Sequence, residues 1–326
     1  MADRVILATA PLRGPGLDAL RGLGEVVLDP WIDQRPLRLY SAEQLAARAA
    51  DVGATVLICE ADRCAGPVLD LPLEAIGATR GDPTNVDVAG ATAAGIPVLR
   101  APGRNADAVA ELTVGLLLAA TRGLVAADRD VRAGEVYRDG TIPYQRFRGW
   151  QLAGRTAGLV GLGAVGRATR WRLEGLGMRV IASDPYADDA THDLDDLLAE
   201  ADVVSMHAAV TPETAGLMSD KRFAALQEGA VYVNAARAAL HDLDALTAAL
   251  ASGHLAAAGL DHFEGESLAT DHPLAGMPNV VLTPHIGGAT YDTEANHTAL
   301  MAEGLAALLR GDVPANLANP EVLARG

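Results

Sequence analysis

Short apolar runs alternate with longer, alanine-rich amphipathic runs along most of the chain, and this alternation restricts the fold more than any other feature. It is typical of parallel strands joined by covering helices. We expect strands at Val5–Ala8, Val26–Leu28, Thr55–Cys59, Ala75–Ala78, Val98–Arg100, Thr156–Val160, Arg179–Ser183, Val203–His207, Ala230–Asn234, Ala256–Leu260 and Val280–Leu282. The sequence therefore predicts an α/β fold with parallel sheets.

The longer runs between the strands predict helices. Three of them have clear bounds, at Ala42–Ala50 after the N-cap Ser41, at Asn105–Arg122 and at Thr290–Leu309. The second is apolar on nearly every face, which predicts burial between domains or subunits. The segment Gly134–Gly154 has no clear period and is expected to be an extended loop or arm. The residues from Pro314 onward are expected to form an extended tail.

Length and charge limit the class of protein. At ~150 residues per domain, 326 residues correspond to about two domains. Lysine and arginine number 26, and aspartate and glutamate number 42, so the formal net charge is −16. Nucleic acids and anionic membranes bind clustered positive charge, so this balance argues against both as partners.

Targeting signals and thiols point to one compartment. Only a short apolar run follows Arg4, unlike a signal peptide, and no stretch reaches the ~18 apolar residues of a membrane-spanning helix. The two cysteines, Cys59 and Cys64, cannot form a disulfide framework. We therefore expect a cytoplasmic protein whose two thiols are reduced and are buried or uninvolved in catalysis, and not nucleophiles.

The run Gly161-Leu162-Gly163-Ala164-Val165-Gly166 is a G-x-G-x-x-G motif in a specific context. A predicted strand precedes it, and an amphipathic run typical of a helix follows it. The first glycine permits a tight turn, the second lets backbone N–H groups approach a pyrophosphate, and the third lets helix and strand pack closely. The motif therefore predicts a dinucleotide site with its anion at a helix N-terminus.

The acidic residue of this fingerprint identifies the dinucleotide. Asp184 ends the next predicted strand, 18 residues past Gly166. Its carboxylate can accept hydrogen bonds from both hydroxyls of the adenosine ribose, and it would repel a 2′-phosphate. We therefore expect NAD rather than NADP as the cofactor.

Three polar residues follow strands downstream of this turn. Arg237 follows the predicted strand ending at Asn234, and arginine offers a planar fork suited to a carboxylate. Taken singly, it would more simply be interpreted as a surface arginine on an exposed loop. His285 follows another strand, and a carboxylate such as Glu266 beside it would favour its protonated form and fix its tautomer. Because ligands bind at the carboxyl ends of parallel strands, these residues together predict a catalytic group.

At this point the chain resembles the D-isomer-specific 2-hydroxyacid dehydrogenases. The resemblance spans most of the chain. Its segments are Val109–Leu112, Gly158–Gly166, Asp184-Pro185, His207, Thr211–Thr214, Asn234–Arg237, Leu260-Asp261 and Thr283–Gly288. It implies an NAD-dependent oxidoreductase that transfers a hydride between NAD(H) and the C2 of a 2-keto or 2-hydroxy acid.

The resemblance also implies roles for single residues. It makes His285 the acid/base, Glu266 its carboxylate partner and Arg237 the substrate-binding arginine. It places Asp261 at the nicotinamide amide. The further residues that it implies at the cofactor are Gly161, Gly163, Ala164, Val165, Gly166, Asp184, Thr211, Ala235 and Gly288.

A second segment resembles the family's substrate-carboxylate loop. It runs from Ala78 to Asp87 and carries Arg80 and Gly81 as expected substrate contacts, although Arg80 could equally be a surface charge. Glu60 stands at a strand end where phosphoglycerate dehydrogenases tend to have arginine. A carboxylate there would repel a substrate phosphate, so we expect a non-phosphorylated substrate.

Other functions remain as alternatives. Phosphoglycerate and phosphite dehydrogenases have the same pattern, and so do non-enzymatic NAD-sensing corepressors. No histidine or cysteine has the spacing of a zinc motif, so no metal is expected, and His262 and His272 are expected to be surface or loop histidines.

The resemblance predicts the domain organisation. We expect two Rossmann-like or flavodoxin-like parallel-sheet domains separated by a cleft. Residues 1–102 and 290–326 would form the substrate-binding domain, and residues 103–289 the NAD-binding domain. A homodimer is expected, and the apolar face of Ala106–Ala120 agrees with one.

Overall fold

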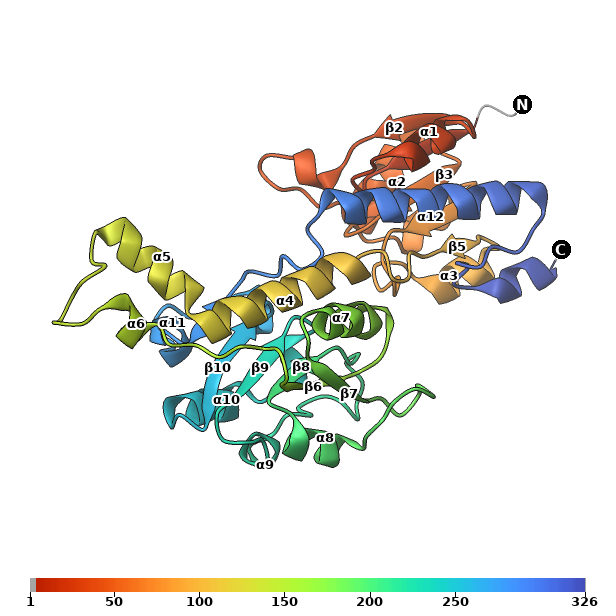
Figure 1. Ribbon diagram of the computed structural model, residues 1–326. Coiled ribbons are helices and arrows are strands. Elements are labelled where there is room, and N and C mark those ends of the chain that lie inside the picture. Colours follow the sequence, from red (N-terminus) through yellow and green to blue (C-terminus); the bar gives the residue numbers. More distant parts are fainter. Residues whose placement is uncertain (1–3, 326) are drawn as a thin grey trace. The chain divides into compact units, whose positions relative to one another are not determined.

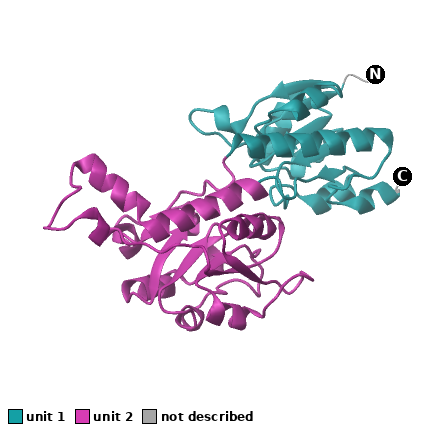
Figure 2. Ribbon diagram, in the orientation of Figure 1, with its two compact units in different colours: residues 1–105, 290–326 teal, residues 106–289 magenta. Residues whose placement is uncertain are grey.

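The computed structural model describes residues 4–325 and divides them into two compact units. Unit 1 holds the residues up to Asn105 and those from Thr290 onward, and unit 2 holds Ala106–Ala289 (Figure 2). The sequence placed the first division three residues earlier, at 102/103. Both units are parallel-sheet α/β domains, as the alternation of apolar runs predicted.

Unit 1 is built on a five-stranded parallel sheet with strand order β2-β1-β3-β4-β5. Its strands are β1 (Val5–Ala8), β2 (Glu25–Leu28), β3 (Val56–Cys59), β4 (Ala75–Ala78) and β5 (Val98–Leu99). All five lie where the sequence predicted them, to within one residue at each end. The residues of β3 and β4 are buried throughout, which explains their uninterrupted apolar runs.

Helices cover both faces of this sheet (Figure 1). They are α1 (Pro15–Arg21), α2 (Ala42–Asp51), α3 (Val88–Ala93) and α12 (Tyr291–Arg310). Leu45 of α2 and Ala91 of α3 pack in the core on one face, and Leu20 of α1 and Met301 of α12 pack on the other. Ser41 begins α2 with a capping box closed by Gln44, as its position before the helix predicted.

Unit 2 is built on a six-stranded parallel sheet with strand order β11-β10-β9-β8-β6-β7. Its strands are β6 (Thr156–Val160), β7 (Arg179–Ser183), β8 (Val203–Met206), β9 (Ala230–Asn234), β10 (Leu255–Leu260) and β11 (Val280–Leu282). The chain order reverses beside β6, which is where open parallel sheets bind their ligands.

Helices again cover both faces of the sheet of unit 2 (Figure 1). They are α4 (Ala106–Arg122) and α7 (Ala164–Gly175) on one face, and α8 (Leu194–Glu200), α9 (Asp220–Ala224) and α10 (Leu243–Ala251) on the other. A short helix, α11 (Pro273–Gly276), precedes β11.

One side of the apolar helix α4 packs in the core of unit 2. Its residues Leu116 and Leu117 are buried against β9 and β10 of the same unit. A Cβ atom at Gly259 of β10 would lie 2.8 Å from the Cβ of Leu116, so the helix sits directly on the strand. The buried side of this apolar helix therefore packs within its own unit.

The segment after α4 is more regular than expected. Helix α5 (Leu124–Ala133) follows directly, and α6 (Pro143–Arg146) interrupts the predicted loop. Arg146 donates to Asp130 of α5 at 2.8 Å, which ties the two helices together. At the other end of the chain the predicted tail ends in a 3₁₀ helix over Pro320–Arg325.

Among the described residues, no single helix is long and apolar enough to cross a bilayer. Helices α4 and α5 reach that length and composition only as a pair, with a bend of 63° where they meet.

Candidate active site

The glycine-rich turn lies between β6 and α7, as its sequence context predicted. Gly161 has a φ of 104°, and a Cβ there would lie 2.6 Å from the backbone nitrogen of Ala208. A Cβ at Gly166 would lie 2.1 Å from the carbonyl oxygen of Gly161. Both positions therefore require glycine, because any side chain would collide with backbone.

The middle glycine leaves room for a ligand. A Cβ at Gly163 would meet no heavy atom within 4 Å, so the space above the turn is open. Gly163 is the N-cap of α7, and Ala164 and Val165 begin that helix of 12 residues with their N–H groups at its positive end. This arrangement fits the pyrophosphate of a dinucleotide.

Asp184 lies at the end of β7 and faces the turn. Its two carboxylate oxygens accept hydrogen bonds from the backbone N–H of Leu162 at 2.7 Å and of Tyr186 at 2.9 Å. A carboxylate has about four acceptor positions, so two remain for ribose hydroxyls. Arg167, the nearest arginine of α7, is held by a bidentate ion pair with Asp189 at 2.6 and 2.7 Å. It is therefore not free to bind a 2′-phosphate.

This geometry predicts a cofactor preference. We expect kcat/KM to be at least tenfold higher with NADH than with NADPH, about 1.4 kcal/mol, because Asp184 repels a 2′-phosphate. Asp184→Asn keeps one acceptor oxygen and removes the charge, so it should lower the ratio of kcat/KM with NADH to kcat/KM with NADPH. Asp188→Asn, an exposed neighbour, is the matched control. Equal kcat/KM values for the two cofactors in the unmodified protein would contradict the assignment.

The other predicted cofactor residues follow strands of the same sheet. Ala235 is buried directly after β9. Thr211 lies in an exposed turn after β8, where Thr214 accepts its backbone N–H at 2.7 Å. Gly288 follows the loop that carries His285. Their proposed contacts to the cofactor stay predictions.

Arg237 follows β9, and its backbone is fixed by Asn234. The side-chain oxygen of Asn234 accepts from the backbone N–H of Ala236 at 3.0 Å and of Arg237 at 3.2 Å. Its amide nitrogen donates to the carbonyl oxygen of Arg237 at 2.9 Å. The guanidinium itself is exposed and donates to the carbonyl oxygen of Ala236. Asn234 therefore fixes the backbone of Arg237, while its proposed contact to substrate stays a prediction.

Sequence reasoning gave Asn234 and His241 no role. Asn234 Nδ2 lies 2.9 Å from Nδ1 of His241, and the Tyr232 hydroxyl lies 3.3 Å from the same nitrogen. Burial lowers the pKa of His241 to about 4, so the ring is neutral and its Nδ1 can accept the hydrogen bond from Asn234. The signal in the sequence was an asparagine at a strand end, three residues before the predicted arginine.

His285 and Glu266 form a hydrogen-bonded pair, as predicted. Nδ1 of His285 lies 2.9 and 3.0 Å from the two carboxylate oxygens of Glu266, so it donates to the carboxylate and leaves Nε2 facing away. Both residues have left-handed backbones, with φ values of 55° and 57°. Such strain in residues other than glycine is concentrated at functional sites.

Asp261 holds the loop that carries His285. It is completely buried, and its carboxylate accepts from the Thr283 hydroxyl at 2.6 Å and from the backbone N–H groups of Ile286 at 2.9 Å and Gly287 at 2.8 Å. Its carbonyl oxygen also accepts from the His285 N–H at 2.8 Å. These four bonds determine the position of the histidine. The predicted contact of Asp261 to the nicotinamide stays a prediction.

His262 lies in the loop after β10, as expected, but it is buried against the histidine of the pair and not at the surface. It is only 5% exposed, and its ring centroid lies 3.8 Å from that of His285. Burial, with smaller contributions from the nearby charges of His285 and Arg237, lowers the pKa of His262 to about 4. Arg237 is thus close enough to the pair to act on the same group.

Glu60 of unit 1 is not the free charge that the sequence suggested. It forms an ion pair with Arg104 and accepts from the indole nitrogen of Trp31 at 3.1 Å. Arg104 also donates to Nδ1 of His297 at 2.7 Å, and Nε2 of that ring donates to the carbonyl oxygen of Pro11 at 2.6 Å. The guanidinium cancels most of the repulsion that Glu60 would exert on an anion.

Arg80 and Gly81 lie in the loop that follows β4, on the same edge of the sheet as Glu60, which follows β3. Arg80 is half-buried, and its carbonyl oxygen accepts from the N–H of Ala101 at 2.7 Å. Cys59 and Cys64 are both buried and free, as expected. The proposed contacts of Arg80 and Gly81 to substrate stay predictions.

Comparison with known proteins identifies the family. The model for the D-isomer specific 2-hydroxyacid dehydrogenase NAD binding domain matches residues 114–287. This range contains the glycine-rich turn, Arg237, Glu266 and His285. Glyoxylate reductase of Thermofilum pendens is 36% identical over 334 residues, covering 99% of this chain and 96% of the relative.

Two further relatives extend the comparison. D-3-phosphoglycerate dehydrogenase of Methanocaldococcus jannaschii is 33% identical and covers 96% of this chain, which spans only 59% of that longer protein. A protein of Thermus thermophilus with a crystal structure is 36% identical, with a TM-score of 0.81 over 96% of this chain and 99% of that chain. The chain therefore belongs to the D-isomer specific 2-hydroxyacid dehydrogenase family and is an NAD-dependent oxidoreductase.

Proposed function

We propose that this protein transfers a hydride between NAD(H) and the C2 of a small, non-phosphorylated 2-keto or 2-hydroxy acid. The observation that carries the proposal is the pairing of His285 with Glu266 at 2.9 Å in the unit that contains the dinucleotide turn. Arg237, Glu266 and His285 follow β9, β10 and β11, so all three belong to the carboxyl edge of one sheet. That edge is where open parallel sheets bind their substrates.

The cofactor-binding residues are those around the glycine-rich turn. Gly163 and the start of α7 would hold the pyrophosphate, and Asp184 would hold the ribose. Bound NADH supplies the hydride for reduction of the ketone, and NAD⁺ accepts it in the reverse direction.

The side chains of unit 2 perform the remaining steps. Arg237 binds the substrate carboxylate and polarises the C2 carbonyl with its planar fork. Protonated His285 donates its Nε2 proton to the oxygen that becomes the hydroxyl. Glu266 accepts from Nδ1 of the same ring, stabilises the imidazolium and fixes its orientation. In oxidation, neutral His285 takes the hydroxyl proton at Nε2.

Two observations support a substrate without phosphate. The relative from Thermofilum pendens, whose match covers 99% of this chain, is a glyoxylate reductase, and glyoxylate is a small 2-keto acid without phosphate. In unit 1, the guanidinium of Arg104 forms an ion pair with Glu60 and is therefore not free to bind a phosphate.

A phosphorylated 2-keto acid is the second candidate. Arg100 lies beside the Arg80 loop, with Nη1 3.5 Å from the carbonyl oxygen of Gly81 and with a buried Nε that has no partner. Arg80 has no ion pair within the described part of the chain. Two such guanidinium groups could hold a second anionic group, and the similarity to a phosphoglycerate dehydrogenase agrees with this alternative.

Steady-state kinetics separate the two candidates. We expect NADH oxidation with glyoxylate or hydroxypyruvate to have a higher kcat/KM than with 3-phosphohydroxypyruvate. Glu60→Gln should raise the relative kcat/KM of the phosphorylated substrate, because it releases Arg104 for the phosphate. A preference for 3-phosphohydroxypyruvate in the unmodified protein would support the second candidate. Tight NADH binding without turnover on any 2-keto acid would indicate a sensor instead.

We also propose a cytoplasmic homodimer that associates through the segment from α5 to α6. This segment exposes six large apolar side chains, namely Leu124, Val125, Val131, Tyr137, Ile142 and Tyr144. Such a concentration of exposed apolar side chains is typical of a protein interface. The free thiols Cys59 and Cys64 agree with a reducing compartment.

Analytical ultracentrifugation tests this interface. We expect a dimer for the unmodified protein and a shift toward monomer for Val131→Glu, because Val131 is 65% exposed on α5. Val313→Glu is the matched control, since Val313 is 69% exposed but lies in unit 1. An unmodified protein that sediments as a monomer would contradict the proposal.

A further inference from the structure

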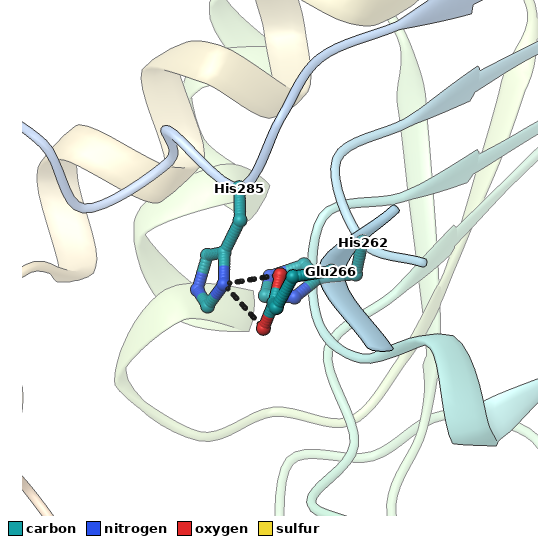
Figure 3. A group of neighbouring side chains, drawn as sticks. All are labelled: His262, Glu266 and His285. Carbon is teal, nitrogen blue, oxygen red and sulfur yellow. Dashed lines mark hydrogen bonds and ion pairs between the residues drawn. The ribbon is translucent and has the colours of Figure 1, made fainter. Parts of the chain in front are cut away.

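His262, Glu266 and His285 bring three metal-ligating side chains together at one point (Figure 3). One ligand atom from each residue lies within 4.8 Å of the others. In the described part of the chain, no other group of three histidine, cysteine, aspartate or glutamate side chains converges in this way. The residues stand at positions 262, 266 and 285, a spacing that matches no zinc motif, so the sequence did not predict the cluster.

His262 takes no part in the hydrogen bonds between His285 and Glu266. In Figure 3 the dashed interactions join His285 to both oxygens of Glu266, and none reaches His262. The residue is only 5% exposed, and its ring stands against the ring of His285 at a centroid distance of 3.8 Å. Since no hydrogen bond within the described residues uses its ring nitrogens, they are available to a ligand.

Two imidazoles and one carboxylate are the donors that Zn²⁺ prefers in sites with an open fourth position. We propose that His262, Glu266 and His285 bind a divalent transition-metal ion such as Zn²⁺, and that this ion inhibits the enzyme by occupying His285. The binding step depends only on the cluster. The inhibition rests on the proposed role of His285 in proton transfer.

The geometry allows the three ligands to close around an ion. In a tetrahedral zinc site with bonds of ~2.0–2.1 Å, neighbouring ligand atoms are about 3.3 Å apart. The side chains of Glu266 and His285 are 63% and 44% exposed, so they have room to move toward the buried His262.

The chemistry of inhibition follows from the same bonds. An ion between the three residues takes the lone pair of Nδ1 of His285, and the proton that Nδ1 donated to Glu266 is released to solvent. A ring that ligates a metal through one nitrogen can no longer carry the two protons of an imidazolium. Reduction therefore lacks its proton donor, and removal of the metal restores it.

Calorimetric titration of the full chain with ZnCl₂ tests binding without reference to activity. The protein is first treated with EDTA and desalted, and no NADH is present. We expect one Zn²⁺ per chain. His262→Val should weaken binding at least tenfold because it removes one of three ligands. His262→Asn serves as a second variant of similar polarity should the valine variant fail to fold. His192→Gln should leave binding unchanged, since the exposed His192–Glu200 pair has no third ligand.

Inhibition is then measured in the NADH oxidation assay, relative to the metal-free rate of each variant. We expect Zn²⁺ to inhibit the unmodified enzyme, EDTA to reverse the inhibition, and His262→Val to need at least tenfold more Zn²⁺ for half-inhibition. The proposal would be overturned if the unmodified protein did not bind Zn²⁺, or if the His262 variants bound it as tightly as the unmodified protein does. Binding without inhibition would retain the metal site and overturn the proposed role of His285 instead.

Discussion

Replacement of His285 by alanine is expected to lower kcat for 2-keto acid reduction by about 10²–10⁴-fold, which is the usual contribution of a positioned acid/base. The reason is that Nε2 of this ring is the proposed proton donor, while Nδ1 is engaged by Glu266 at 2.9 Å. NADH binding, measured by fluorescence titration, should survive, because the glycine-rich turn lies between β6 and α7. A near-normal kcat for His285→Ala would mean that another group moves the proton.

Glu266→Gln is the companion variant. The imidazolium of His285 loses its anionic partner but keeps a hydrogen-bond acceptor, so its protonated form becomes less favourable. Reduction needs that protonated form, and its pH profile should therefore move toward lower pH. In a protein that already carries His285→Ala, Glu266→Gln should leave the pH profile unchanged, since the carboxylate then has no ring to act on. An unchanged profile would show that the pair does not function together.

Loss of Arg237 is expected to have the second largest effect. Arg237→Ala should lower kcat/KM by about 10²–10³-fold, equivalent to about 3–4 kcal/mol, because the substrate carboxylate loses its charge-assisted bidentate partner. The guanidinium has no role in the fold, since it is exposed and donates only to the carbonyl oxygen of Ala236. Thermal unfolding should therefore change little.

Two further variants make this test specific. Arg237→Lys keeps the charge but not the planar fork, so it should recover only part of the loss. Arg310→Ala removes an exposed arginine of α12 that pairs with Asp312, and it should leave kcat/KM unchanged. If Arg237→Ala and Arg310→Ala behaved alike, Arg237 would not bind substrate.

The sequence was sufficient for the sheets and for the dinucleotide turn. Strands β1, β4, β6, β7, β9 and β11 begin and end where the sequence placed them. The central strands β4, β6 and β9 are buried throughout, and such strands are near-continuous apolar runs. The glycine pattern was equally informative, since Gly161 and Gly166 have no room for a Cβ. Such local requirements leave a direct mark on the sequence.

The pair of His285 and Glu266 was predicted from strand order and family resemblance, but its geometry was not. Their left-handed backbones depend on surrounding contacts, above all on the four bonds that Asp261 makes to the 283–287 segment. Asn234 likewise positions Arg237 through bonds to its backbone. A short motif shows which residues are present, but it does not show which hydrogen bonds hold them.

The tertiary structure alone decided which charged and polar groups meet across the sequence. Glu60 forms an ion pair with Arg104, which lies 44 positions away in the sequence. This pairing neutralises a carboxylate that the sequence suggested was unpaired. His262 acquired His285 as a neighbour 23 positions away, which buries a histidine expected at the surface. The sequence by itself determined the parallel sheets and the glycine-rich turn, because those depend on local pattern. The partners of Glu60 and His262 depend on long-range packing, which no local pattern records.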